Sequence, residues 1–116
     1  MKRDMDLIRE MLRIMEESES AQAPSMTIEG YTKEQVGFHA LLLIEAGLAD
    51  GQRLATLGVG IEPAGRLFKI TWEGYEFLAN AKDDSVWEKA KAKAGDVSFS
   101  VLSVALQKLV IEKIGL

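Results

Sequence analysis

The first segment of the chain, residues 4–17, places apolar and charged side chains at helical spacing. One stripe along it is apolar: Leu7, Ile8, Met11, Leu12 and Met15. This pattern predicts an amphipathic helix that buries the stripe in a core, with Asp4 or Asp6 complementing its positive end. The polar stretch 18–25 then predicts a loop, and the Met-Thr-Ile run at 26–28 predicts a short strand.

A second helix is predicted from Thr32 to about Ala46. Thr32 and Gln35 have the spacing of a capping box, in which each residue satisfies a free N–H group near the other. Gly47 has the position of a left-handed cap at the C-terminal end of the helix. Both ends of this helix are therefore predicted from local chemistry.

Helical periodicity is lost between residues 48 and 71, where extended runs replace it. Residues 55–59 and 67–71 predict two strands, and the glycine- and proline-containing segment 58–65 predicts the loop that joins them. The first strand is the weaker prediction, because Ala55 and Gly58 are poor strand formers. Together the two runs predict a long-looped hairpin.

Three more helices are predicted, over residues 72–81, 85–95 and 97–114. Thr71 can cap the first, and Ser85 can open the second with a capping box. The first helix is expected to bury some combination of its large apolar residues: Trp72, Tyr75, Phe77 and Leu78.

The order helix, strand, helix, hairpin, helix and helical tail is that of a winged-helix domain. We therefore predict an α+β fold, with a winged-helix-like domain, a small hairpin wing and appended C-terminal helices. The 116 residues suit a single domain overall. Within it, residues 1–96 are expected to form the winged-helix-like part, and residues 97–116 an apolar helix that packs on it or on a second copy.

Composition narrows the function classes. The chain has no cysteine, which excludes disulfides, thiolate metal sites and thiol catalysis, and fits a cytoplasmic protein. Its longest apolar run, residues 40–44, is far shorter than a membrane span, so we expect no membrane association.

No catalytic, cofactor or metal site is predicted. His39 is the one histidine, and a metal site needs several converging ligands. We expect His39 to be partly buried with one hydrogen-bonded nitrogen. The Gly58-x-Gly60 pair would need a third glycine where Pro63 stands, so we interpret it as the tip of the wing. The paired carboxylates at 16–17 and 83–84 lie near helix ends, where neighbouring side chains diverge. The sequence therefore predicts that the protein is not an enzyme.

Charge bears on a nucleic-acid partner. There are 14 Lys and Arg against 18 Asp and Glu, a net charge of −4, whereas phosphate binding requires at least a local basic surface. Candidate contacts with a DNA backbone lie on the wing: Arg53, Arg66 and Lys69. One face of the second helix carries two acids, two large apolar residues and no group that reads bases: Glu34, Phe38, Leu41 and Glu45. That face fits a protein partner better than the major groove.

The last helix is apolar on more than one side. It contains Phe99, Val101, Leu102, Val104, Ala105, Leu106, Leu109, Val110, Ile111 and Ile114. Packing across the first helix and packing on a second copy both account for this excess. Leu106 and Ile111 are the candidate contacts of a homodimer.

Several segments resemble the prophage-associated proteins grouped as domain of unknown function 2513. The resemblance rests on residues 1–9, 38–48, 70–78, 83–87 and 98–102, and so spans nearly the whole chain. It implies a winged-helix-like fold and a bacterial or phage genome, but no activity. Residues 39–48 and 70–78 are also similar to the recognition helix and to the step after the wing in bacterial winged-helix repressors. Two hypotheses stay open: a nucleic-acid-associated regulator and a protein-interaction module.

Overall fold

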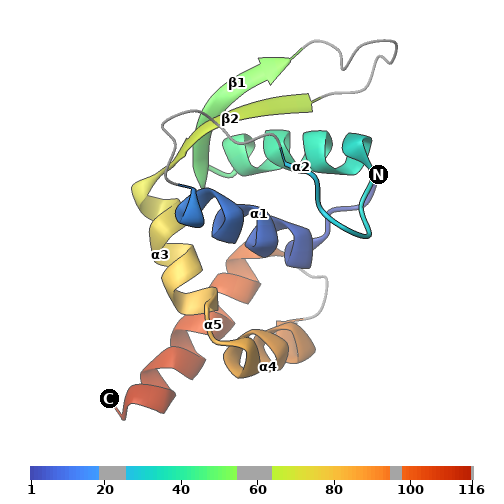
Figure 1. The fold of residues 1–116 in the computed structure, drawn as a ribbon. Coiled ribbons are helices and arrows are strands. Elements are labelled where there is room, and N and C mark those ends of the chain that lie inside the picture. The colour runs from blue at the N-terminus through green and yellow to red at the C-terminus, as the bar shows by residue number, and fades with distance from the viewer. Residues whose placement is uncertain (19–25, 55–63, 95–97, 116) are drawn as a thin grey trace. The chain divides into compact units, whose positions relative to one another are not determined.

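The computed structural model describes residues 1–18, 26–54, 64–94 and 98–115 of the chain. Within these ranges it contains five helices and one two-stranded antiparallel sheet, which confirms the mixed α+β class (Figure 1). In chain order the elements are α1 (Met5–Glu17), α2 (Lys33–Glu45), β1 (Ala49–Leu54), β2 (Ala64–Ile70), α3 (Trp72–Ala81), α4 (Asp84–Ala94) and α5 (Phe99–Ile114).

The chain divides into two compact units, residues 1–75 (unit 1) and residues 76–116 (unit 2). The division falls inside α3. In unit 1, α2 contacts both strands and α1, and α1 also contacts β2. In unit 2, α4 and α5 pack against each other.

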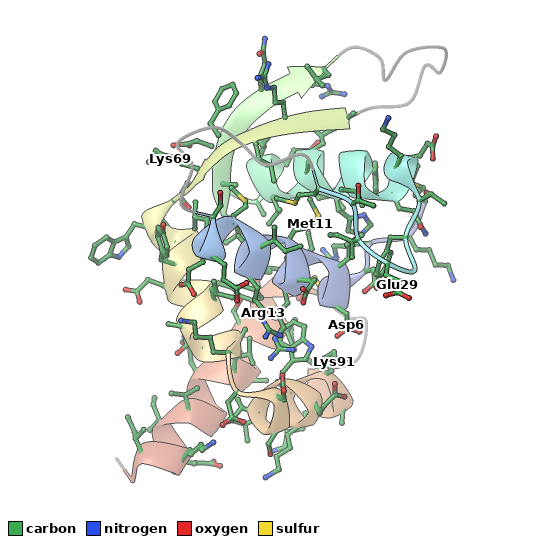
Figure 2. The ribbon with its side chains drawn as sticks, viewed as in Figure 1. Asp6, Met11, Arg13, Glu29, Lys69 and Lys91 are labelled. Carbon is green, nitrogen blue, oxygen red and sulfur yellow. The ribbon has the colours of Figure 1, made fainter. Side chains whose placement is uncertain are left out.

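In unit 1, α1 has the predicted amphipathic form. The Asp4 carboxylate accepts hydrogen bonds from the N–H groups of Asp6 and Leu7, at 2.9 and 3.2 Å, and so caps the helix. Met11 extends from α1 toward α2 (Figure 2). The buried stripe matches the prediction apart from Met15, which is half-buried: Leu7, Ile8, Met11 and Leu12.

The second helix, α2, begins and ends where the sequence predicts. The Thr32 hydroxyl accepts from the Gln35 N–H at 3.1 Å, and the Gln35 side-chain oxygen accepts from the Thr32 N–H at 2.8 Å. Gly47 follows the helix with a φ of 75°, a conformation that favours glycine. Because the hairpin and α1 both pack on α2, its buried residues lie on several sides: Val36, His39, Ala40, Leu41 and Leu43.

The predicted hairpin is present, and β2 (Ala64–Ile70) includes residues 67–70 of the predicted second strand. β1 begins at Ala49, and β2 begins at Ala64, which the sequence placed in the connecting loop. The predicted first strand, residues 55–59, and the predicted wing tip lie outside the described residues. Tertiary contact overrides strand propensity here, because Ala49 and Gly51 are poor strand formers that pair beside α2.

One irregularity shapes the hairpin. The register pairs Asp50 with Lys69 and Gly51 with Leu67, which leaves Phe68 without an opposite residue. Such a β-bulge bends the strand and redirects the side chain of the extra residue. Phe68 is half exposed as a result of its place outside the ladder.

The strand predicted at residues 26–28 is wrong. These residues are described, and none of them lies in a strand. The chain turns instead: the Tyr31 N–H donates to the Ile28 carbonyl at 3.1 Å, and Gly30 has a φ of 88°. A short apolar run becomes a strand only if it meets a partner strand, and among the described residues β1 and β2 pair with each other alone.

Two glycines allow close backbone approach, one between the two strands of the hairpin and one between the hairpin and α2. A Cβ atom on Gly65 would meet the backbone nitrogen of Leu41 at 2.7 Å, and one on Gly51 would meet the carbonyl oxygen of Arg66 at 2.2 Å. Both distances are below van der Waals contact with backbone atoms, which cannot rotate away. Close packing of β2 on α2 therefore requires glycine at position 65.

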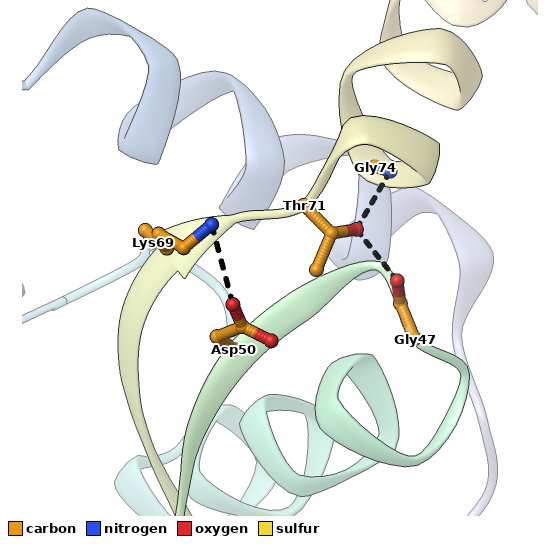
Figure 3. A network of polar contacts seen from close by, with 5 residues as sticks. All are labelled: Gly47, Asp50, Lys69, Thr71 and Gly74. Atoms are coloured by element: carbon orange, nitrogen blue, oxygen red, sulfur yellow. Dashed lines mark hydrogen bonds and ion pairs between the residues drawn. The ribbon is translucent and has the colours of Figure 1, made fainter.

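Thr71 joins the end of β2 to the start of α3 (Figure 3). Its hydroxyl donates to the Gly47 carbonyl at 2.6 Å and accepts from the Gly74 N–H at 3.0 Å. The predicted cap is confirmed, and it also fixes the end of α2. A Cβ atom on Gly74 would lie 2.0 Å from the Leu48 carbonyl oxygen, so the first turn of α3 is held against the start of the hairpin.

In unit 2, α4 begins at Asp84, one residue before Ser85, which was predicted to open the helix. Asp83 accepts from the Val86 N–H at 3.0 Å through its carboxylate and from the Trp87 N–H at 2.9 Å through its carbonyl. The predicted Ser85 cap is wrong, because Asp83 already satisfies these first N–H groups. The hydrogen bond from Lys113 of α5, followed by that from Val86, lowers the pKa of the Asp83 carboxyl.

Aromatic rings fill the centre of unit 2. The Phe77 ring lies 6.2 Å from that of Trp87 and 5.1 Å from that of Phe99, so residues of three helices meet there. Ser98 caps α5 by accepting from the Val101 N–H at 3.1 Å, slightly after the predicted start. The buried side of α5 includes Leu102 and Leu106.

Candidate functional site

The three cations predicted for the wing are all exposed, but they do not form one basic patch. Opposite residues of a ladder share a face, and successive residues alternate. Arg66 is opposite Gln52, and Arg53 is opposite Gly65, whose Cβ position faces α2. Arg53 and Arg66 therefore project from opposite faces of the hairpin.

The third cation, Lys69, has a partner. Its ammonium lies 3.3 Å from the Asp50 carboxylate, across the strand pair (Figure 3). Both side chains are well exposed, at 69% and 57%. The pair contributes little to stability, but it offsets the positive charge at this end of the hairpin.

The largest exposed side chains in unit 1 are aromatic and lie close together in the sequence. Phe68 of β2 and Tyr75 of α3 are each 50% exposed, and Trp72 is 77% exposed. Trp72 and Tyr75 are three residues apart, so they lie on the same side of α3. We call Phe68, Trp72 and Tyr75 the aromatic surface.

The sequence predicts that α3 buries some combination of its large apolar residues, and the structure confirms this. Phe77 and Leu78 of α3 are buried, as the pattern allowed, whereas Trp72 and Tyr75 are not. A helical wheel gives the reason, because Gly74, Phe77, Leu78 and Ala81 lie on one side of α3 and Trp72 lies opposite them. That spacing was a signal by which the exposed aromatics could have been found.

The open face of α2 is acidic, as predicted, but its apolar part differs. Glu34 and Glu45 are exposed and Phe38 is half-buried. Leu41 lies on the same side of the helix but is only 4% exposed, so the prediction that it is open to a partner is wrong. The backbone of Leu41 lies against Gly65 of β2, which covers that side of the helix.

His39 is more completely enclosed than predicted. It is 1% exposed, and both ring nitrogens are bonded rather than one. Nε2 accepts from the Asp4 N–H at 2.8 Å, and Nδ1 lies 2.8 Å from the Gln35 carbonyl, which can only accept. These partners require the neutral ring with its proton on Nδ1. No ring nitrogen is left to act as a base, so His39 ties α2 to the start of α1.

Tyr31 completes this junction. Its hydroxyl donates to the second carboxylate oxygen of Asp4 at 2.9 Å. Burial first, then this hydrogen bond and the negative charges of Asp4 and Asp6, raise the pKa of Tyr31 to about 12. Asp4 therefore caps α1 and holds the segment before α2 at the same time.

Within residues 1–18, 26–54, 64–94 and 98–115, no group of three or more His, Cys, Asp or Glu residues is placed to hold a metal ion. In the same residues, no helix is long and apolar enough to cross a membrane.

The candidate dimer contacts on α5 have different surroundings. Ile111 is 47% exposed, whereas Leu106 is fully buried in unit 2, so of the two candidate contacts only Ile111 is open to a second copy. The exposed apolar residues of α5 are Val101, Val104, Ile111 and Ile114. Val101 and Val104 also line a groove of about 460 Å³ along α5.

Comparison with known proteins identifies the family. Residues 2–100 match a family model described as "Hypothetical protein (DUF2513)". The chain belongs to this family. It is also 32% identical over 117 residues to a protein of Haemophilus influenzae described as "Uncharacterized protein", and the match covers 95% of this chain and 96% of that one. No solved structure matches the chain.

Family membership confirms the resemblance in the sequence but adds no activity. The matched range contains α1 to α4 and all of the aromatic surface, and it ends at the start of α5. Arguments about function therefore depend on the side chains that the fold exposes.

Proposed function

We propose that this protein is a non-catalytic protein-binding module of winged-helix type. The observation that carries the proposal is the aromatic surface, where Phe68, Trp72 and Tyr75 are exposed by half or more. Apolar area left in water forgoes about 25 cal/mol per Å² of burial free energy, which a partner that covers it recovers. Tryptophan and tyrosine are also the residues on which the binding energy of interfaces concentrates.

The charges around the aromatic surface support a protein partner. Arg66 and Lys69 are exposed on β2, Asp50 on β1 and Glu73 on α3, so both signs of charge are present. An apolar centre with a mixed polar rim is the usual anatomy of a transient protein interface. Of these four residues, Lys69 forms an ion pair with Asp50. Arg66 is the cation that remains near Phe68 on β2.

Binding to nucleic acid through the hairpin is the second candidate, and one observation favours it. Arg66 and Lys69 flank Phe68 on an exposed strand, and a ring between cations can stack on a base. The acids Glu34 and Glu45 on α2 oppose this alternative, because they would face the phosphates in a recognition-helix pose. A regulator that contacts DNA weakly through Arg53, Arg66 and Lys69 thus ranks second.

The order of elements supports the winged-helix relationship. α1 and α2 precede the β1–β2 hairpin and α3 follows it, which is the winged-helix order without the strand expected between the first two helices (Figure 1). His39 supports a non-catalytic role. It is the one histidine of the chain, and both of its ring nitrogens are engaged in hydrogen bonds. The bacterial relative agrees with the bacterial or prophage origin that the resemblance implies.

Site-specific cross-linking tests the proposal. A photoreactive amino acid replaces Trp72 in one variant and the exposed Glu34 of α2 in another, and both are irradiated in the native cell. We expect a defined protein adduct at position 72 and none at position 34. Adding Phe68→Ala and Tyr75→Ala to the position-72 variant should remove that adduct, while circular dichroism stays unchanged.

The same proteins separate the two candidates. Fluorescence anisotropy with labelled duplex at low salt should show weak binding, or none, that does not depend on sequence. Tight and sequence-selective binding that Arg66→Ala and Lys69→Ala abolish would favour the nucleic-acid alternative. Protein adducts at position 34 but not at position 72 would move the binding surface to α2.

A further inference from the structure

The outward face of α5 carries a repeat that its own unit does not use. Val101, Val104 and Ile111 are 44%, 57% and 47% exposed. Together with Lys108 they are spaced by three, four and three residues, which is the spacing of a coiled-coil seam. The opposite side of the helix, with Leu102 and Leu106, is buried within the unit.

Charges lie at the two ends of this seam. The groove of about 460 Å³ beside it is lined by Lys93 of α4 near Ser100 and Val101, and by Glu112 farther along α5. At 1.5 Å per residue, Ser100 and Glu112 are about 18 Å apart along the helix axis. Neither Lys93 nor Glu112 forms an ion pair with any residue that the structure describes.

We infer that α5 pairs with α5 of a second copy in antiparallel orientation, along the Val101–Ile111 seam. In a two-fold arrangement centred at the level of Leu106, Val101 faces the partner's Ile111 and Val104 faces the partner's Lys108. This is the a-to-d layering of antiparallel coiled coils. The Lys108 stem covers Val104 of the other helix while its ammonium stays in water.

The register that aligns the apolar residues also brings opposite charges together. It sets Ser100 opposite the partner's Glu112, which brings Lys93 of each chain to Glu112 of the other. Two symmetric ion pairs result, one at each end. A parallel pairing would instead bring Lys108 to Lys108 and Glu112 to Glu112, and like charges in contact oppose association.

The interface is small. Two 16-residue helices bury less than the roughly 1,600 Å² of a standard stable interface, so we expect micromolar affinity. The α5 seam lies in unit 2, whereas the aromatic surface lies in unit 1. Pairing through α5 is therefore independent of the function proposed above.

Sedimentation of the full-length chain from about 5 µM to about 500 µM tests the inference, because this range spans micromolar affinity. We expect a monomer–dimer equilibrium. Lys93→Glu and Glu112→Lys should each weaken it about tenfold or more, because each creates two like-charge contacts. Lys89→Glu makes the same charge change on α4 outside the groove and should leave it unchanged.

Two combinations are specific to the antiparallel register. The double variant Lys93→Glu/Glu112→Lys should dimerise like the wild type. A mixture of the two single variants should form heterodimers, although each alone is weak. Because the chain has no cysteine, a Val101→Cys chain should form a disulfide with an Ile111→Cys chain, and not with itself.

Each opposite outcome overturns the inference. A wild-type chain that stays monomeric throughout the range would exclude self-pairing. A dimer that ignores both single charge reversals, or that cross-links Val101→Cys to itself, would place the contact elsewhere or in parallel orientation. Far-ultraviolet circular dichroism of each variant separates these results from misfolding, and the exposed positions substituted here are expected to fold normally.

Discussion

Unit 1 and unit 2 bring their elements together by different means. In unit 1 the junctions are polar and close: His39 and Tyr31 bond to Asp4, and Thr71 bonds to Gly47 and Gly74. Glycine, which has no side chain, stands where two backbones approach each other, as at Gly65 and Gly74. In unit 2 the junction is a cluster of rings, centred on Phe77, and α4 and α5 lie along each other.

This difference teaches where substitutions will be tolerated. Directional hydrogen bonds and backbone contacts fix one geometry, and any added atom disturbs it. A cluster of rings is less directional, but removing one ring leaves a cavity that costs both burial and dispersion energy. The two units should therefore respond in opposite ways to gain and loss of volume.

The largest effect is expected in unit 2, from Phe77→Ala. Removing a buried ring from between Trp87 and Phe99 should lower the free energy of unfolding by about 3–5 kcal/mol. Urea denaturation followed by tryptophan emission measures it. The matched control is Phe68→Ala, the same substitution at a half-exposed ring of unit 1, which should cost less than about 0.5 kcal/mol. Equal losses would show that exposure does not distinguish the two rings.

In unit 1 the methyl group added by Gly65→Ala should be strongly destabilising. Its Cβ would lie 2.7 Å from the Leu41 nitrogen, so β2 and α2 must separate. We expect a loss of about 2–3 kcal/mol in urea unfolding. Gly30→Ala is the control, because Gly30 has open space but a φ of 88°. Backbone strain alone should cost about 1 kcal/mol there. A smaller loss at Gly65 than at Gly30 would remove the argument from close packing.

His39→Phe tests the polar junction with little change of volume. It leaves the Asp4 N–H without an acceptor in a buried place, which should cost about 2 kcal/mol. His39→Gln, which keeps an acceptor, should cost less. Nitrogen chemical shifts of the wild-type ring provide an independent check, since the structure requires a protonated Nδ1 and an unprotonated Nε2. The opposite tautomer would contradict the assigned bonds.

Tyr31→Phe should have the smallest effect, about 1 kcal/mol near neutral pH, the net value of one hydrogen bond. The pKa of Tyr31 is raised from its ordinary 10.0 to about 12, so folding favours the protonated phenol. This contribution is complete below pH 10 and declines as the pH rises through the folded pKa of about 12. Unfolding of wild type and variant should therefore converge above pH 10. Titration of tyrosinate absorbance should show one phenol, absent from the variant, that ionises near pH 12.

Local chemistry determines the helix faces and the helix caps of this protein. The stripe of α1, the capping box at Thr32, the Gly47 cap and the Thr71 cap each depend on residues a few positions apart. Their energies are decided within one turn of chain, so the sequence predicts them directly. The order of the helices and the presence of a hairpin followed from the same periodicities.

Other features depend on contacts between distant residues, which only the tertiary structure decided. The strand expected at 26–28 had no partner edge, and β2 extends to Ala64 because Gly65 fits against α2. Of the candidate site residues, Arg53, Arg66, Lys69, Phe38 and Ile111 are at least partly exposed, while Leu41 and Leu106 are buried. Periodicity assigns a residue to a side of a helix, but which sides are covered depends on the elements that pack there. For the same reason the spacing in α3 places Trp72 opposite Phe77 and Leu78, whereas packing decided which of these two sides is buried.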